Sequence, residues 1–158
     1  MSWLTENIDE AIAQYLFNVK VDNLPTGSYQ RNIVPDIDIN FDLLEQQLRE
    51  TPEMIAFFNM LLVEQHMKVE ITQRRIKAMR GKIIERMLND ARQQNVELRT
   101  TEMKEIINAD KVLIKLDAQL IHDQHCEDKL KVTVETLMRK FDALRSLAGF
   151  KKEEMRNA

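Results

Sequence analysis

The sequence predicts an all-α protein whose main part is a long antiparallel helical hairpin or bundle. Three observations support this class. The 158 residues include only three Gly and three Pro, and no Pro follows Pro52. Residues 53–158 are rich in Leu, Met, Glu, Gln, Lys and Arg, which favour helices. Apolar residues in this part also recur in heptads, as in coiled-coil seams. The composition disfavours a Gly-rich phosphate loop and a doubly wound sheet.

The first third of the chain is expected to form short elements. Apolar residues at helical spacing predict a helix over residues 7–19. Pro25 and Gly27 predict a turn or linker over residues 24–29. Apolar and acidic side chains alternate over residues 33–39, which favours a short extended segment.

Two helix starts are predicted next. A short helix is expected over residues 41–49, with Asp38 or Asn40 as its cap. A long helix is expected to begin at the Thr-Pro-Glu sequence of residues 51–53. The hydroxyl can cap the helix, Pro suits the first helical position, and an acid there meets the positive end of the helix dipole. This helix would run to about Gln94.

A corner and a last long helix complete the chain. After the first long helix we expect a break with a fresh cap at residues 100–101. A short helix over residues 102–108 and a second corner at residues 108–110 follow. The last helix is expected over residues 111–147, ending before Gly149.

Both long helices carry heptad seams. In the first long helix, one of the two seam positions is apolar through about five heptads, and the other is mixed. The last helix has an apolar seam that only Asp123 and Glu127 interrupt. Helices of about 40 residues span roughly 60 Å, which exceeds the diameter of about 40 Å of a compact monomer of this length. We therefore expect an oligomer. The seam residues are Ile55, Leu62, Val69, Ile76 and Ile83 with Phe58, Gln65, Thr72, Met79 and Arg86 in the first helix, and Leu113, Leu116, Leu120, Leu130, Val134, Leu137, Phe141, Leu144 and Ala148 in the last.

We expect three segments: an acidic N-terminal arm over residues 1–35 with a short helix and linker, a helical domain over residues 36–150, and a tail over residues 151–158. No run of eighteen apolar residues occurs, so no membrane-spanning helix is expected. No basic residue precedes Lys20, which argues against a signal peptide. The single cysteine, Cys126, cannot form an internal disulfide, which is typical of the cytoplasm.

The net charge of -3 is distributed unevenly along the chain. Residues 1–65 contain three basic residues (Lys and Arg) and eleven acidic residues (Asp and Glu). Residues 66–92 contain eight basic and three acidic residues, and residues 93–158 contain twelve basic and twelve acidic residues. Cations along one rigid helix can follow a phosphate backbone, so salt-sensitive and largely sequence-independent binding of nucleic acid is one interpretation. Residues 59–140 lack aromatic side chains, so the backbone would carry most of the affinity. The candidate contacts are Lys68, Arg74, Arg75, Lys77, Arg80, Lys82 and Arg86.

A second interpretation is that these cations pair with acids of neighbouring helices, which the acidic first 65 residues could supply. The protein would then be a structural coiled-coil or assembly-chaperone protein that does not bind DNA. A helicase-loading adaptor is a third alternative: it would also bind DNA, but its effect would require a helicase.

The sequence offers little for catalysis or metal binding. His122, His125 and Cys126 are the only cluster of potential metal ligands, and a closed zinc site needs four. Asp123 and Glu127 occupy seam positions, where polar residues more often fix the register or accept a cation. We therefore expect no enzyme, no catalytic residues, no metal and no cofactor.

One stretch resembles a known family. The sequence Glu-Met-Lys-Glu-Ile-Ile-Asn-Ala-Asp-Lys of residues 102–111, followed by Leu113, Lys115 and Asp117, resembles the corresponding corner of phage recombination mediator proteins of the UvsY type. The basic-aromatic residues 139–141 are similar to a motif near that family's C-terminus. The resemblance covers roughly residues 36–150. The family's Tyr-Tyr-Ser-Gly-like stretch is replaced here by Lys-Ile-Ile-Glu.

The resemblance implies a ring-forming homo-oligomer that binds single-stranded DNA. Such a protein helps to load a RecA-like recombinase onto strands covered by single-strand-binding protein. It acts in DNA recombination and repair in the cytoplasm, which is the host's if a phage encodes the chain, and it has no membrane partner. Among the candidate contacts the resemblance points to Arg74, Arg75, Lys77, Arg80 and Lys82, with Arg80 as the best positional match.

Overall fold

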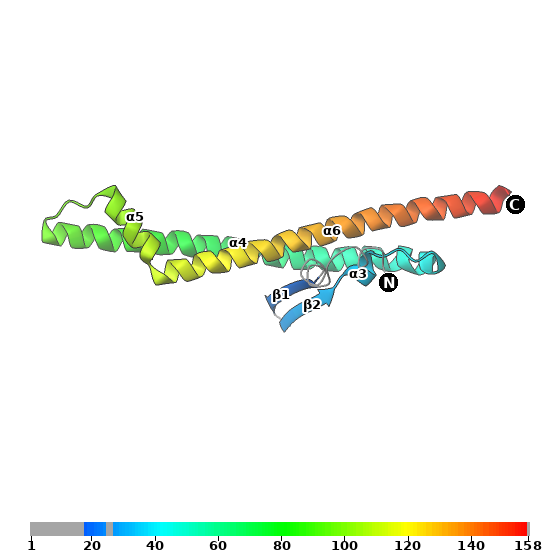
Figure 1. Cartoon of the computed structure of the whole chain (residues 1–158), viewed down its shortest axis with the longest axis horizontal. Coiled ribbons are helices and arrows are strands. Elements are labelled where there is room, and N and C mark those ends of the chain that lie inside the picture. Colours follow the sequence, from blue (N-terminus) through cyan, green and yellow to red (C-terminus); the bar gives the residue numbers. More distant parts are fainter. Residues whose placement is uncertain (1–17, 25–26, 158) are drawn as a thin grey trace, which may run out of the picture. The chain divides into compact units, whose positions relative to one another are not determined.

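The computed structural model describes residues 18–24 and 27–157, and it is predominantly helical (Figure 1). The predicted helical class is confirmed, whereas two short strands were not expected. The predicted helix over residues 7–19 lies outside the described residues except for its last two, which belong to a strand. In chain order the elements are β1 (Asn18–Leu24), β2 (Gly27–Asn32), α3 (Val34–Ile37), the 3-10 turn η1 (Phe41–Leu43), α4 (Leu44–Gln94), α5 (Thr100–Ala109) and α6 (Lys111–Asn157).

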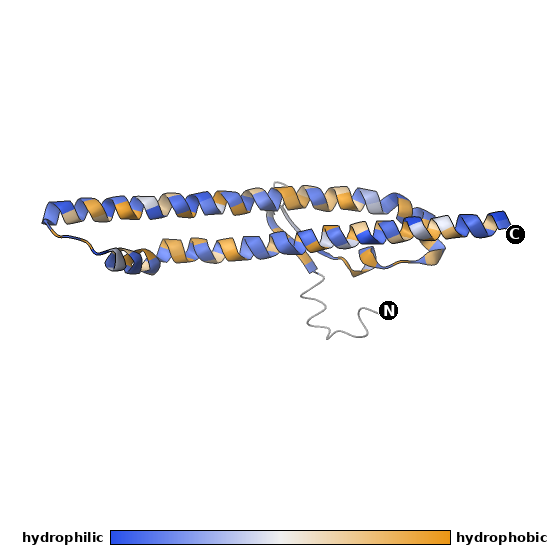
Figure 2. Cartoon of the chain, turned by 90° about the horizontal axis from the view of Figure 1, so that it is seen from above, coloured by the Kyte–Doolittle hydropathy of each residue, from blue (hydrophilic) through white to orange (hydrophobic). Residues whose placement is uncertain are grey.

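The chain forms two compact units. Unit 1 consists of the residues up to 65 together with those from 126 onward, and unit 2 consists of residues 66–125. Within each unit α4 and α6 lie side by side and run in opposite directions (Figures 1 and 2). These units differ from the division predicted at residues 35 and 150. The strands share a core with the long helices, and α6 continues through residue 150.

The strands β1 and β2 form an antiparallel hairpin, with Val19 opposite Arg31 and Val21 opposite Tyr29. The segment over residues 24–29, predicted as a turn or linker, contains the reversal of the chain between Leu24 and Gly27, which pair with each other, but its two ends belong to strands. The physical reason is the period of two in the sequence Val-Lys-Val-Asp. It turns both valines toward one face, where they are buried.

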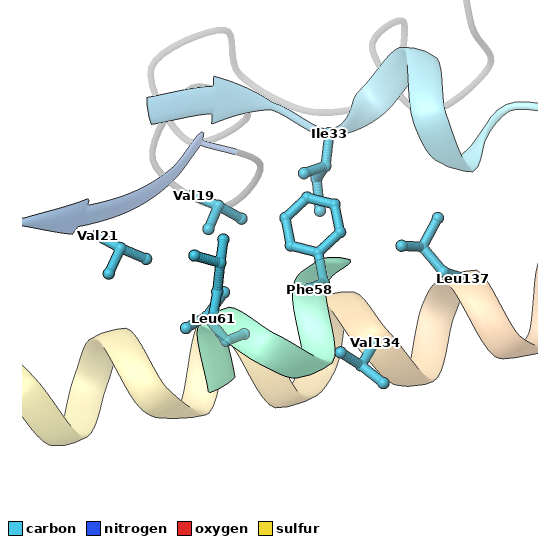
Figure 3. Packing of buried hydrophobic residues seen from close by; sticks show 8 residues of the cluster. Val19, Val21, Ile33, Phe58, Leu61, Val134 and Leu137 are labelled. Atoms are coloured by element: carbon cyan, nitrogen blue, oxygen red, sulfur yellow. The ribbon is translucent and has the colours of Figure 1, made fainter. Parts of the chain in front are cut away.

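The hydrophobic core of unit 1 joins the hairpin to both long helices. Phe58 and Leu61 of α4 meet residues of α6 and of the hairpin, and Figure 3 shows Phe58 beside Ile33. Every seam position of α6 from Leu130 to Leu144 is buried or half-buried, as the heptads predict. The buried cluster is Val19, Val21, Ile33, Phe58, Leu61, Leu130, Val134 and Leu137.

The long helix α4 begins at Leu44, so the helix start predicted at residues 51–53 is wrong. Thr51 is buried inside the helix, and its Oγ1 donates to the Gln47 carbonyl at 2.6 Å instead of capping a terminus. Gln47 also bonds backbone groups of the preceding segment, accepting from Asn40 N at 3.0 Å and donating to the Asp38 carbonyl at 3.0 Å. These contacts hold the first turns in place ahead of the proline.

The segment before α4 is also more helical than predicted. Residues 33–39 were expected to be extended, but Val34–Ile37 forms the short helix α3. Asn32 Oδ1 accepts from Val34 N at 2.9 Å, and the following proline suits the first helical turn. Asn40 accepts from Asp42 N at 3.0 Å, which confirms Asn40 as a cap.

The break between α4 and α6 agrees with the prediction at most points. The helix α4 ends at Gln94, and Asn95 has a positive φ of 54°, a conformation that Asn tolerates. Asp110 caps α6 by accepting from the backbone N–H groups of Val112 and Leu113, each at 2.9 Å. The predicted end of the last helix at residue 147 is wrong, because α6 passes through Gly149 to Asn157. A single exposed Gly costs only about 1 kcal/mol within a helix.

Asp123 and Glu127, the two acids in the seam of α6, are buried, at 8% and 7% exposure. Each has a partner on its own helix. Gln119 Nε2 donates to Asp123 Oδ1 at 2.8 Å, and Lys131 Nζ lies 2.8 Å from Glu127 Oε1. Partners one turn away offset part of the cost of burying charge, which suits a structural role for both acids.

Lys140 is buried at 5% exposure, although it belongs to the basic-aromatic motif at residues 139–141. Its Nζ donates to the Asp36 carbonyl at 2.7 Å, and Arg31 lies 2.6 Å from the carboxylate of the same aspartate. Lys140 therefore joins α6 to α3 in unit 1 and cannot contact a strand of nucleic acid.

A pH-dependent stability is expected from Lys140. Burial lowers the pKa of its amine below the ordinary 10.5, although Asp36, Asp38 and Glu50 partly oppose the shift. The unfolded chain then holds this proton more tightly than the folded chain. The contribution of Lys140 to stability therefore rises as the pH increases from the folded pKa toward 10.5.

This expectation is tested by urea unfolding of the wild type and of Lys140→Met, which keeps the apolar stem, at pH 7 and pH 10. The free energy of unfolding of the wild type minus that of the variant should be larger at pH 10. Tyr29, whose pKa burial raises, titrates in both proteins and should largely cancel. A difference that falls with pH would contradict the expectation.

Candidate nucleic-acid interface

All seven predicted contact residues lie on the part of α4 that belongs to unit 2. This part contains no Pro, and its seam residues Val69 and Ile76 are buried. Its remaining surface carries the charged residues together with exposed apolar ones such as Met67 and Ile71. Lys68 is half-buried. The exposed ones are Arg74, Arg75, Lys77, Arg80, Lys82 and Arg86.

The cations surround the exposed half of the helix rather than forming a single row. At about 100° per residue, Lys68, Arg75, Lys82 and Arg86 fall within about 40° of each other. Lys77 lies about 140° from Lys82 by the same projection, on the side of α4 that faces α6. Unit 2 contains twelve Lys and Arg against nine Asp and Glu, a net charge of +3.

Two of the exposed cations have acidic partners, both of them in unit 2. Arg74 lies 3.1 Å from Glu70 one turn away, and Arg80 lies 3.6 Å from Asp117 of α6. Both pairs are exposed and therefore weak, so phosphate groups can compete for these guanidinium groups. Within residues 18–24 and 27–157, the other four exposed cations form no ion pair: Arg75, Lys77, Lys82 and Arg86.

A groove between α4 and α6 lies inside unit 2 and has a volume of about 530 Å³. Three aliphatic side chains line it beside polar and charged ones, and the Arg80–Asp117 ion pair joins its two helices. The sequence indicates Asp117 only through the family resemblance, and no sequence pattern marks Gly81 as a site residue. The groove depends on which residues of α4 and α6 face each other, which the pattern of one helix does not show. Its lining residues are Gln73, Ile76, Lys77, Arg80, Gly81, Ile84, Asp117 and Leu120.

The remaining candidate is the cluster of possible metal ligands on α6. His122 and His125 are exposed, and Cys126 is half-buried. No group of three His, Cys, Asp or Glu side chains able to hold a metal ion occurs among the residues that the structure describes. No described helix combines the length and the apolar character needed to cross a membrane.

Among solved structures, the chain is similar to the crystal structure of the bacteriophage T4 recombination mediator protein UvsY. The TM-score is 0.54 and the sequence identity is 17%, and the match covers 76% of this chain and 91% of the UvsY chain. The two proteins share a fold. This finding confirms, for the fold, the resemblance to the UvsY type seen at residues 102–117. No protein-family model and no curated protein matches the sequence.

Proposed function

We propose that the chain is a non-enzymatic recombination mediator that binds single-stranded DNA. It would help to load a RecA-like recombinase onto strands covered by single-strand-binding protein, in the cytoplasm of the host if a phage encodes it. The observation that carries the proposal is the group of four exposed cations on α4 that form no ion pair within the described residues, in a chain with the fold of UvsY.

The physical basis is electrostatic. Each Lys or Arg that neutralises a phosphate releases condensed counterions, so the affinity falls steeply with salt and depends little on base sequence. A strand held on this surface is deflected from the path that it follows on single-strand-binding protein. The binding free energy gained here offsets part of the cost of displacing that protein, and recombinase subunits can then begin to assemble.

The structural alternative predicts that acids neutralise the basic residues of α4. Within the described residues, Glu70 pairs with Arg74 and Asp117 pairs with Arg80, and both pairs are exposed. This favours an external anion as the partner of Arg75 and the other cations without ion pairs.

We propose that the protein acts as a homo-oligomer, with a ring as the form that the family resemblance implies. Large apolar side chains are exposed on the helices of both units, as is typical of association surfaces. A ring would multiply the cations by the number of subunits. The acidic residues of the first 65 positions, apart from the buried Asp36, would then be available to protein partners such as the recombinase. The exposed apolar side chains include Met60, Val63, Val132 and Met138 in unit 1 and Met67, Ile71, Ile114 and Ile121 in unit 2.

A recombinase assembly assay tests the proposed function. Single-stranded DNA is first saturated with single-strand-binding protein, and a RecA-like recombinase from the same genome is added with and without this chain. We expect the chain to shorten the lag before DNA-dependent ATP hydrolysis, with no helicase present. An unchanged lag, or an effect that appears only with a helicase, would contradict a mediator role.

A further inference from the structure

We propose that the groove between α4 and α6 in unit 2 receives unstacked nucleobases of the bound strand while the adjacent cations hold its phosphates. This inference rests on the proposed binding of single-stranded DNA and specifies how the strand is held. Its occupant is the base of a single strand, because the bases of a duplex are paired and stacked and cannot enter.

The groove combines the two kinds of surface that a nucleotide needs. Ile84 and Leu120 provide aliphatic contacts for the faces of a base, and the buried Ile76 lines the groove beside them. Lys77 and Arg80 line the same groove and place positive charge where the sugar-phosphate backbone would pass. Its volume of about 530 Å³ is within the usual range for small-ligand sites. Aliphatic contacts accept any base, which agrees with binding that is largely independent of sequence.

Gly81 keeps the groove open. It lies on α4 between Arg80 and Lys82, and a Cβ built at this position would meet no atom within 4 Å. A larger side chain at position 81 can therefore extend over the groove without disturbing the packing of the helices. Replacing this exposed helical glycine also favours the helix, so a loss of binding would not reflect a loss of structure.

The chain provides a matched control at Gly149. This second glycine lies on the exposed surface of α6 in unit 1, and a Cβ there would also meet no atom within 4 Å. Gly149→Leu makes the same chemical change in a helix as Gly81→Leu, but it covers no groove residue.

The test compares two labelled oligonucleotides of 30 nucleotides with identical phosphate backbones, dT30 and a fully abasic strand, at one low salt concentration. We expect the wild type to bind dT30 at least about tenfold more tightly, the factor expected when roughly 50 Å² of apolar surface is buried. Gly81→Leu should remove most of this preference while leaving the affinity for the abasic strand within about twofold. Gly149→Leu should behave like the wild type.

The outcomes separate this inference from the proposed function. Equal binding of both strands by the wild type would overturn the base site and leave strand binding intact. A Gly81→Leu variant that keeps the preference, or that loses affinity equally for both strands, would also overturn it. No binding of either strand would overturn both proposals. The comparison of the two strands on the wild type needs no variant, so the test does not depend on the folding of Gly81→Leu.

Discussion

Replacing Arg75, Arg80 and Lys82 together by Ala is expected to weaken binding of single-stranded DNA by about 100-fold near 0.1 M salt. Each phosphate contact on a single strand contributes about 0.7 to the slope of log affinity against log salt, and three lost contacts lower the slope by about 2. All three side chains are exposed, and only Arg80 has an ion pair within the described residues, with Asp117. The three substitutions should therefore lower the affinity for DNA without lowering the stability of the fold. Fluorescence anisotropy with a labelled oligonucleotide measures it.

The control removes the same number of charges from the exposed end of α6. The variant Lys151→Ala, Lys152→Ala, Arg156→Ala lies in unit 1, outside the proposed interface. Its affinity should remain within a few-fold of the wild type. Circular dichroism and mass in solution should be unchanged for both triple variants. Equal losses in the two variants would indicate a general charge effect and would contradict the proposed interface.

Phe58→Ala is expected to lower the free energy of unfolding by about 3–5 kcal/mol, the usual cost of removing a large buried aromatic side chain. Phe58 is 1% exposed and belongs to the core that joins the β1–β2 hairpin to α4 and α6. It also makes edge-to-face contacts with Tyr29 and Phe57, with ring centroids 6.1 Å and 5.6 Å apart. Its removal would leave a cavity beside Ile33 and Leu137, because the hairpin and the helices meet there.

Phe57→Ala provides the comparison, because Phe57 is the neighbouring aromatic residue but is 38% exposed. The free energy of unfolding of this variant should be lower than that of the wild type by roughly 1 kcal/mol, mainly because the contact with Tyr29 at 5.2 Å is lost. Urea unfolding followed by circular dichroism measures both variants. A loss for Phe58→Ala no larger than that for Phe57→Ala would show that this core does not hold the hairpin to the helices.

The long helices could be predicted because their information is local. The heptads of α4 and α6 place Val69, Ile76, Leu130 and Leu137 on buried faces, and those residues are buried. The start of α4 could not be predicted in the same way, because Thr51 resembles a cap in sequence. Contacts of Gln47 with the segment before the helix determine the start instead.

The hairpin was not predicted, because the alternation of apolar and polar residues over residues 19–22 is short. The neighbouring Pro25 and Gly27 indicate a turn or linker more strongly than they indicate strands. Val19 and Val21 also depend on distant partners, because they belong to one buried cluster with residues of α4 and α6. The burial of Lys140 could not be predicted for the same reason, because its partner, the Asp36 carbonyl, lies 104 residues away in the sequence.

Of the candidate site, too, the sequence predicts the features that depend on one helix but not those that depend on contacts between helices. Exposure of Arg75, Lys77 and Lys82 follows from the helical pattern around Ile76, so these candidates could be named from the sequence. The groove and the Arg80–Asp117 pair depend on how α4 and α6 face each other in unit 2. Periodicity within either helix does not contain that information.

Salt-dependent titration of the full chain with a labelled single-stranded oligonucleotide, from 50 to 300 mM salt, tests the central claim most directly. If about five of the seven cations contact phosphates, log affinity should fall linearly with log salt with a slope of about -3.5. Affinity that is undetectable at 50 mM salt, or that does not change with salt, would contradict the assignment of α4 as a surface for single-stranded DNA.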